Sequence, residues 1–345
     1  MSPSSPANRP NPGSARGGDW PKVRLHVVSG KGGTGKTTVA AALALALASG
    51  GRRVLLMEVE GRQGIAQLFD TPPLPYEERL VAVAPDGGEV FALAVDPEAA
   101  LLEYLEMFYN MRRAGSALRK LGAIDFATTI APGVRDVLLT GKAIEAVKRG
   151  ERAGKPAYDA IVMDAPPTGR IARFLNVSSE VAGLAKVGPI KSQSDSVMAV
   201  IRSPRTAVHL VTLLEEMPVQ ETLDGIQELH ESRLPVGAVI VNMMRGPRLT
   251  PDGVAAALDG TLDFDEVKAG VEAARLPRKL NTTTVSKVLM AEAAEHAQRI
   301  ELERIERERL DTTDQPIYEL PEMSGGIDLG ALYAMSRMLR DQGAV

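Results

Sequence analysis

The chain has 345 residues, of which 44% are hydrophobic and 4% aromatic, and its formal net charge is -4. That length allows one large domain or two ordinary ones, and the chain lacks the basic surplus of a general nucleic-acid binder. The absence of cysteine excludes disulfides, thiolate zinc sites and cysteine nucleophiles, and no apolar run approaches the roughly 20 residues of a membrane-spanning helix. We therefore expect a cytoplasmic protein that binds neither nucleic acid nor zinc, with a disordered tail over 1–20.

Apolar segments of strand length alternate with helical patterns along the chain. Strands are expected at 23–29, 53–59, 90–95, 158–164, 207–213, 236–241 and 316–320, and helices at 36–49, 97–113, 134–148, 219–229, 286–310 and 329–339. This alternation predicts an α/β fold, a doubly wound and mostly parallel sheet with helices on both faces. Stretches with few strand signals, around 97–150, 177–200 and 250–310, predict helical insertions that form a small helical subdomain within a single domain over 21–345.

A glycine-rich loop follows the first predicted strand and precedes the first predicted helix. Residues 30–37 read GKGGTGKT and fit the pattern G-x-x-x-x-G-K-[ST]. Its glycines let phosphate oxygens approach backbone N–H groups, and the helix N-terminus adds a partial positive charge. We expect Lys36 to contact the β- and γ-phosphates and the Thr37 hydroxyl to bind Mg²⁺. The loop therefore predicts binding of MgATP.

The same loop also contains the pattern G-x-G-x-x-G, starting at Gly30. Glu58 and Glu60 lie about where a dinucleotide-binding protein holds the ribose. Against this interpretation, the Lys-Thr pair that ends the loop has no role at a pyrophosphate, and Lys31 adds a second cation. Asp164, at the end of a predicted strand, supplies the acid that a nucleoside triphosphatase needs near its Mg²⁺. These residues favour a nucleoside triphosphate over a dinucleotide.

Several motifs together resemble one class of ATPases. KGGTGKTT at 31–38 is similar to the deviant phosphate loop of the class that includes cell-division-site and partition ATPases, nitrogenase iron protein, arsenite-pump ATPases and the targeting factors for tail-anchored membrane proteins. DAPPTG at 164–169 resembles switch II of the arsenite-pump and tail-anchor-targeting family. Further segments resemble stretches of that family in the same order, at 128–142, 214–222, 239–242 and 320–325. The chain is identified as a member of this family.

The resemblance implies catalytic roles for particular residues. Lys31 resembles the signature lysine that acts across a dimer interface. Glu60 falls where the family's switch I aspartate positions the attacking water, and Asp164 resembles the acid near Mg²⁺ that also couples to switch II. Lys31, Glu60 and Asp164 are therefore the catalytic candidates, and Thr37 and Asp164 are the candidates for binding the metal.

The resemblance also implies a larger set of nucleotide contacts. It consists of the loop and of residues that follow later strands: Gly32, Gly33, Thr34, Gly35, Lys36, Thr37, Thr38, Glu215, Asn242 and Pro321. Within this set, Glu215 resembles a glutamate that approaches ATP at the dimer interface. Asn242 resembles the residue that hydrogen-bonds adenine, and Pro321 lies in the segment that resembles the C-terminal adenine loop.

Two departures from the family pattern bear on turnover. Switch I reads EGRQ at 60–63 where the family has D-P-A-(H/S), and Arg170 stands where the tail-anchor-targeting proteins have His. Because glutamate is one methylene longer than aspartate, hydrolysis is expected to be slow or to need a partner. Glu58 lies two residues before Glu60 and is expected to hold the loop or a partner's lysine rather than the water.

The partners are also a matter of resemblance. A lysine that acts in trans implies a homodimer or a heterodimer with a homologous ATPase chain, coupled to a membrane-protein client or transporter. Without cysteine, the arsenite site and the zinc clamp of relatives are absent. The short, polar stretch at 175–205 argues against a full client groove. The alternative is a nucleotide-dependent interaction subunit with little turnover, paired with a homologous ATPase chain.

Overall fold

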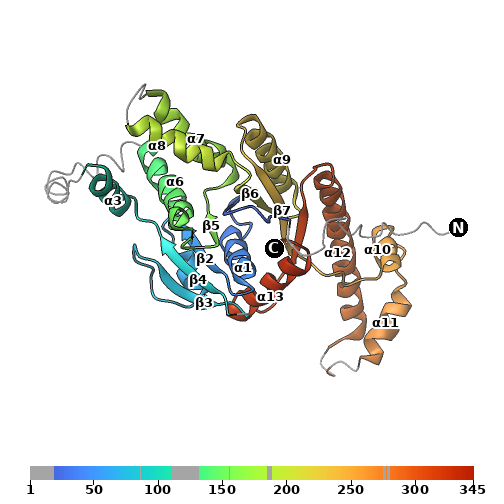
Figure 1. Cartoon of the computed structure of the whole chain (residues 1–345). Coiled ribbons are helices and arrows are strands. Elements are labelled where there is room, and N and C mark those ends of the chain that lie inside the picture. Colours follow the sequence, from blue (N-terminus) through green and yellow to red (C-terminus); the bar gives the residue numbers. More distant parts are fainter. Residues whose placement is uncertain are drawn as a thin grey trace.

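The computed structural model describes residues 19–345 except 86, 110–131, 155, 185–188, 275–276 and 278–279. At its centre lies an eight-stranded sheet in the order β3-β4-β2-β5-β1-β6-β7-β8 (Figure 1). The strands are β1 (Leu25–Gly30), β2 (Arg53–Glu58), β3 (Arg79–Val83), β4 (Glu89–Ala94), β5 (Ala160–Asp164), β6 (Thr206–Thr212), β7 (Val236–Met244) and β8 (Ile317–Pro321). Neighbouring strands are parallel, except that β3 runs antiparallel to β4. The predicted α/β fold with a mostly parallel sheet is confirmed.

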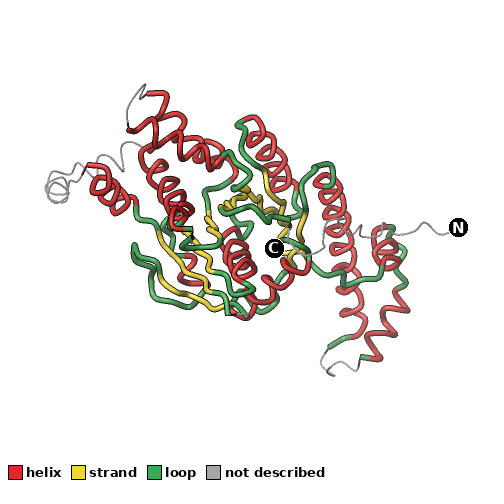
Figure 2. Tube along the Cα trace, in the orientation of Figure 1, coloured by secondary structure: helices red, strands yellow, loops and turns green. Residues whose placement is uncertain are grey.

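Helices cover both faces of the sheet, as Figure 2 shows. One face carries α3 (Pro97–Tyr109), α6 (Pro132–Lys148), α7 (Thr168–Leu184), α8 (Pro189–Ile201) and α9 (Glu216–Glu231). The other face carries α1 (Lys36–Ala48), α2 (Gly64–Leu68) and α13 (Leu329–Asp341). A short 3-10 turn, η2 (Glu151–Ala153), lies between α6 and β5. The remaining helices, α10 (Pro251–Leu258), α11 (Phe264–Ala273) and α12 (Thr282–Leu310), form a helical arm that projects away from the sheet (Figure 1).

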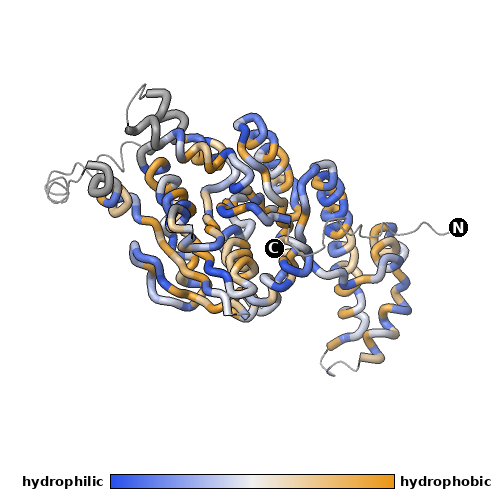
Figure 3. The backbone as a smooth tube through the Cα atoms, viewed as in Figure 1, coloured by the Kyte–Doolittle hydropathy of each residue, from blue (hydrophilic) through white to orange (hydrophobic). Residues whose placement is uncertain are grey.

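Helix α1 is the most deeply buried helix described. It follows the glycine loop, and every residue from Val39 to Ala48 is buried. The segment alternates alanine and leucine, and Figure 3 shows it as predominantly hydrophobic on all sides. A helix that is apolar all round must be enclosed, and α1 packs between the sheet and α13. Its N-terminus is therefore held in place at the edge of the sheet where the glycine loop ends.

The topology brings the ends of three strands together. In the sheet register, Asp164 of β5 lies opposite Val28 of β1 on one side and Glu58 of β2 on the other. The chain places β2 and β5 to one side of β1 and β6 to the other, so the strand order reverses around β1. Ligands of doubly wound sheets bind at such a reversal, outside the carboxyl ends of the strands. The glycine loop lies at this position.

The structure differs from the sequence predictions in a few elements. Strand β3 was not predicted, although residues 80–84 form the continuous apolar run LVAVA; it is an antiparallel edge strand that exposes Leu80 and Val83. Helix α12 begins at Thr282 rather than 286, because the Asn281 side chain accepts a hydrogen bond from Thr284 N and caps the helix. Helix α7 begins directly after the switch II turn, well before the predicted helical stretch at 177.

Some predicted segments lie wholly or partly outside the residues that the structure describes. The predicted tail falls mostly outside the described residues, but Trp20 packs against the core and Asp19 accepts a hydrogen bond from Tyr318, so these two belong to the packed structure. The C-terminal end of the predicted helix at 97–113 and the start of the segment at 128–142 also lie outside the described residues. Within the described ranges, no helix is long and apolar enough to span a bilayer.

Candidate nucleotide-binding site

The glycine loop has the backbone conformation that its sequence requires. Gly33 and Gly35 have φ angles of 91° and 82°, in the left-handed region that glycine adopts readily. Gly35 also forms the N-terminal cap of α1, and a Cβ there would collide with the Asn242 amide. By contrast, a Cβ on Gly32 or Gly33 would meet nothing within 4 Å. The loop is thus closed on the side of β7 and open on the side where its backbone N–H groups would meet a phosphate.

A buried carboxylate lies beside the start of α1. The Thr37 hydroxyl donates a 2.6 Å hydrogen bond to Asp164 Oδ2, and Lys36 is buried next to them. Asp164 Oδ1 is buried and has no hydrogen-bond partner among the described residues. Burial raises the pKa of the Asp164 carboxyl to about 6; the Thr37 hydrogen bond and the Lys36 charge lower this pKa, and the carboxylate of Glu58 raises it.

These donors fit a hard divalent cation. Mg²⁺ takes oxygen ligands, commonly a hydroxyl and one or two carboxylates together with phosphate oxygens. Thr37 supplies the hydroxyl, and Oδ1 of Asp164 supplies an oxygen that no described residue bonds. A cation at this position would also favour the ionised carboxylate that burial disfavours. The arrangement that the sequence predicts for the metal is therefore chemically suitable for Mg²⁺.

The two glutamates after β2 have different environments. Glu58 is 2% exposed, and its carboxylate accepts hydrogen bonds from the backbone N–H groups of Gln63 and Ile65. It therefore holds the loop, as predicted. Glu60 is only half-buried, and its Oε2 lies 3.6 Å from Nη2 of Arg62 on the same loop. The predicted role of Glu60 in orienting a water molecule stays a prediction.

Lys31 points towards a helix of its own chain. Its Nζ lies 2.7 Å from Oε1 of Glu221 in α9, and both side chains are partly exposed. The Thr34 hydroxyl closes the base of the loop by donating a 2.9 Å hydrogen bond to the Lys31 carbonyl. Glu221 lies inside the segment 214–222 that carries the resemblance, but nothing in its spacing identified it as the partner of a loop lysine. The ion pair occupies Lys31 in the single chain.

The other predicted nucleotide contacts are divided between the loop and the surface. Asn242 is buried, and its Nδ2 donates a 2.9 Å hydrogen bond to the Thr34 carbonyl, so it supports the loop from β7. Glu215 is exposed at the N-terminal cap of α9, and Pro321 ends β8 opposite Met244 of β7. Thr38 lies half-buried in the first turn of α1. Adenine contacts of Asn242 and Pro321 stay a prediction.

The switch II turn is fastened to β1 by a residue that sequence reasoning missed. Ser29, buried in β1, donates a 2.6 Å hydrogen bond from its hydroxyl to the Pro166 carbonyl. The buried Thr168 hydroxyl that follows has no hydrogen-bond partner in the described part of the chain. Arg170, the departure from the family pattern, is exposed. Serine at the end of a strand is common, and its spacing alone carries no signal.

A parallel sheet with a glycine loop after β1 and acidic residues at the ends of β2 and β5 defines a phosphate-loop nucleotide-binding fold. Comparisons with known proteins agree. The family model described as Anion-transporting ATPase matches residues 23–204, which include the loop, both glutamates after β2 and the switch II turn. The chain belongs to the anion-transporting ATPase family.

Relatives of the chain are named as ATPases. ATPase BagA of Mycobacterium tuberculosis is 56% identical over 328 residues, which cover 94% of this chain and 96% of that protein. ATPase GET3 of Kluyveromyces lactis is 25% identical over 251 residues, covering 63% of this chain and 71% of that protein. ATPase get3 of Neurospora crassa is 29% identical over 177 residues, covering 51% and 49%. The likeness to BagA extends over nearly the whole length of both chains.

Proposed function

We propose that the protein binds MgATP at the glycine loop and hydrolyses it as a dimeric switch coupled to a membrane-linked client or transporter. The observation that carries the proposal is the buried Asp164, which lies next to the Thr37 hydroxyl and Lys36. Its Oδ1 has no hydrogen-bond partner in the described part of the chain. A buried carboxylate with a spare oxygen next to an open glycine loop is explained by a cation–phosphate ligand. Membership of the family supports the same activity.

Each part of the loop has a distinct task in this proposal. The backbone N–H groups of residues 32–38 and the Lys36 ammonium hold the β- and γ-phosphates. Thr37 and Asp164 hold Mg²⁺, which on binding neutralises charge on the phosphate oxygens. Glu60 orients the attacking water, since Glu58 is committed to the loop. Phosphoryl transfer needs mainly positioning and charge stabilisation, so these residues suffice without a covalent intermediate.

The proposed dimer rests on the resemblance of Lys31 to a lysine that acts in trans. The present partner of Lys31 is Glu221 of its own chain, 2.7 Å away. A lysine that stabilises the transferred phosphoryl group of a second chain must leave this ion pair first. We therefore expect the free chain to be in a resting state. In nucleotide-dependent dimerisation, Lys31 would exchange Glu221 for the phosphoryl group of the second chain. The coupling to a membrane-linked client rests on the resemblance to the tail-anchor-targeting ATPases.

The decisive experiment for the site is metal-dependent binding. Calorimetric titration with ATP, in the presence of Mg²⁺ and then of a chelator, should show tighter binding with metal in the parent. Asp164→Asn should abolish most of this difference and leave metal-free binding intact, because it removes the carboxylate and keeps the shape. Asp252→Asn, at an exposed position of α10, is the matched control and should behave as the parent does.

Steady-state phosphate release then tests turnover. If Asp164→Asn retains the full effect of Mg²⁺ on ATP affinity, the site is assigned wrongly. If the parent binds MgATP but releases no phosphate, either alone or with a co-purified partner, the interaction-subunit function replaces hydrolysis.

A further inference from the structure

Gln63 adopts a conformation that is unusual for its residue type. It precedes α2 with φ 57° and ψ 26°, in the left-handed region that non-glycine residues rarely occupy. Its backbone N–H donates to the Glu58 carboxylate. Its side-chain amide makes a pair of hydrogen bonds with the backbone of Leu74: Nε2 donates to the carbonyl at 3.1 Å, and Oε1 accepts from the N–H at 2.7 Å. The backbone of Gln63 is thus bonded to Glu58, and its side chain is bonded to Leu74.

On one side, Gln63 adjoins the nucleotide site. The next residue, Gly64, lies so close to Thr37 that a Cβ would be 3.2 Å from the Thr37 methyl and 3.8 Å from its hydroxyl oxygen. Thr37 also donates to Asp164, so Gly64 lies beside one of the proposed metal ligands. A change in the Thr37 rotamer or position is therefore transmitted directly to this loop.

On the other side, Leu74 begins a short connection, residues 74–78, that we name the strap. Leu74 is buried in the core. The Tyr76 hydroxyl donates a 2.5 Å hydrogen bond to Glu103 of α3. Glu78 accepts hydrogen bonds of 2.7 and 2.9 Å from Arg149, which follows α6, and one of 2.6 Å from the Tyr158 hydroxyl. The strap thereby connects Gln63 to the helices α3 and α6.

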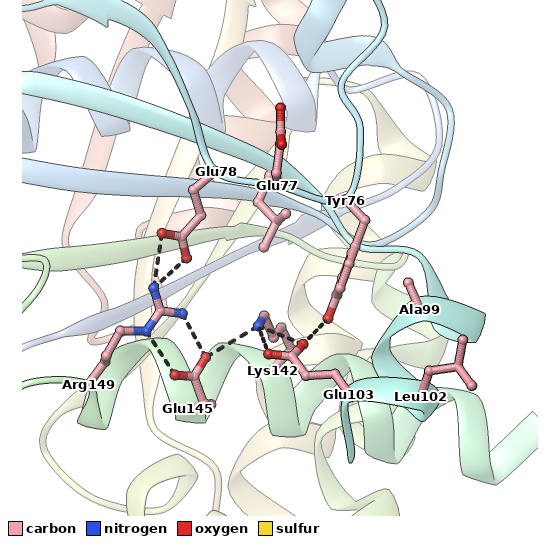
Figure 4. Close-up of a pocket in the computed structure, with 10 residues that line it drawn as sticks. Tyr76, Glu77, Glu78, Ala99, Leu102, Glu103, Lys142, Glu145 and Arg149 are labelled. Atoms are coloured by element: carbon pink, nitrogen blue, oxygen red, sulfur yellow. Dashed lines mark hydrogen bonds and ion pairs between the residues drawn. The ribbon is translucent and has the colours of Figure 1, made fainter. Parts of the chain in front are cut away.

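The strap forms one wall of a cleft of about 570 Å³, drawn in Figure 4. That volume lies within the range of small-molecule pockets. Lys142 of α6 connects the facing helices through an ion pair of 2.8 Å with Glu103 of α3. Within α6 it also lies 3.5 Å from Glu145. Arg149 pairs with Glu145 and Glu78. These ion pairs are partly exposed, and such pairs exchange partners at little cost. The cleft is therefore able to change shape without unfolding.

We propose that Gln63 is a positioning residue that couples the occupancy of the glycine loop to the shape of the cleft between the strap and helices α3 and α6. The inference rests on the proposed binding of MgATP at that loop. The two-state element is Gln63 itself. Its left-handed conformation is maintained by hydrogen bonds to Glu58 and Leu74, and when these bonds are lost it relaxes to the right-handed region, which turns its side chain away from the strap.

The chemistry of the side chain makes the proposal specific. The primary amide of Gln63 donates to the Leu74 carbonyl through its nitrogen and accepts from the Leu74 N–H through its oxygen. Gln63→Glu keeps the acceptor and loses the donor, and Gln63→Met keeps the length and loses both. Gln67→Met, at an exposed position of α2 four residues later, is the matched control.

The absence of cysteine allows a direct measurement. Glu77→Cys introduces a single labelling site into the full chain, at an exposed position on the strap. The Glu77 side chain pairs with Arg79 and points away from the ion pairs of Lys142 and Arg149 (Figure 4). An environment-sensitive fluorophore at this site is read while a non-hydrolysable MgATP analogue is titrated, and the analogue's Kd is measured separately by calorimetry. We expect a saturable fluorescence change in the labelled parent and in Gln67→Met. Gln63→Met should lose most of the change, and Gln63→Glu part of it, with the analogue still bound.

The outcomes separate this proposal from the proposed function. If the parent does not bind the analogue, the nucleotide assignment fails. If the parent binds it without a fluorescence change, or if Gln63→Met keeps the full change, the coupling is wrong. If Gln63→Met misfolds, Tyr76→Phe serves instead, with the label moved to Ala99→Cys on α3. Loss of the response at Ala99 in this variant supports the strap as the connection, and an undiminished response contradicts it.

Discussion

The nucleotide edge of the sheet and the helical arm are built in opposite ways. At the sheet edge, charged and polar side chains are buried: Lys36, Glu58, Asp164 and Asn242 all lie in the interior. In the arm, most polar side chains are exposed, although Ser286 and Glu306 are buried. Several large apolar side chains are exposed as well, among them Leu258, Val288, Leu289 and Leu302. Burial of ionisable groups is costly unless they have partners or a ligand. The buried groups at the sheet edge therefore indicate a ligand-binding site, whereas the arm presents its side chains to solvent.

The largest effect should come from the phosphate-binding lysine. Lys36→Ala removes a buried ammonium from the β- and γ-phosphates, and we expect MgATP affinity to fall about 100-fold, or about 2.7 kcal/mol. Lys268→Ala in α11, which removes an exposed lysine 4.0 Å from Glu272, should leave affinity unchanged. Calorimetry measures both. Equal losses in the two variants would mean that the sheet edge is not the binding site.

The next effect separates the glutamates after β2. Glu60→Gln should keep MgATP bound and reduce kcat about 100-fold, a barrier change of about 2.7 kcal/mol, because water is no longer oriented. Glu58→Gln should instead lower the melting temperature, since its carboxylate holds two backbone N–H groups of the loop. Single-turnover hydrolysis and thermal melts distinguish the two variants. A Glu60→Gln protein that hydrolyses ATP at the parental rate, with Glu58→Gln inactive, would reverse the assignment.

A pair of buried histidines on the neighbouring strands β1 and β6 predicts that the folded protein loses stability in acid. His26 Nδ1 lies 3.0 Å from His209 Nε2, and the rings stack in the interior. The backbone N–H of Ala238 donates to His209 Nδ1, so His209 acts as donor to His26. Burial lowers the pKa of His209 to about 4 and, together with the charge of His209, holds the pKa of His26 well below its usual value. Both imidazoles are therefore neutral in the folded protein.

The sign of the pH effect follows from proton binding. Below about pH 6.5 the two histidines bind protons in the unfolded chain, whereas the buried imidazoles of the folded protein stay neutral. Stability is therefore fully present above pH 6.5 and is lost as pH falls towards 4, with a slope of up to about 1.4 kcal/mol per pH unit for each histidine. Urea unfolding at several pH values measures it. His209→Gln should flatten the slope, and His296→Gln in the arm should not; identical slopes would contradict the prediction.

The smallest expected effect concerns Glu221. Glu221→Gln releases Lys31 from its own chain and should raise nucleotide-dependent dimerisation or turnover by a few-fold, since an exposed ion pair contributes at most about 1 kcal/mol. Lys31→Ala should spare ATP binding and reduce hydrolysis. Glu228→Gln, also exposed on α9, is the control. Sedimentation at several protein concentrations measures dimerisation, and unchanged association in Glu221→Gln would show that the ion pair does not restrain Lys31.

Sequence reasoning located the elements that carry strong local signals. The buried strands read as continuous apolar runs, and the glycine loop fixed the position of Lys36, Thr37 and the start of α1. Strand β3 was missed although residues 80–84 form the apolar run LVAVA and the strand is as long as β5. The run is short and is followed at once by Pro85, and a short apolar run does not specify a strand by its periodicity alone.

Contacts between distant segments were beyond the reach of sequence spacing. Lys31 meets Glu221 and His26 meets His209 only because β1 lies beside β6, and α9 follows β6. Gln63 was visible as a departure from the family's switch I pattern, but its hydrogen bonds to Leu74 depend on a loop that no motif describes. Glu58 is the exception, because strand period and the position of Glu60 predicted its supporting role correctly.

The complete enclosure of α1 makes it the fixed reference of the molecule. A helix surrounded by packed alanine and leucine from Val39 to Ala48 has no room to tilt or slide. Displacement caused by a change of nucleotide must therefore appear in the segments around α1, namely switch I, the strap and the start of α9. Structures of this chain in different nucleotide states should accordingly superpose well on α1 and β1, which makes these elements the natural frame in which to measure how far the other segments move.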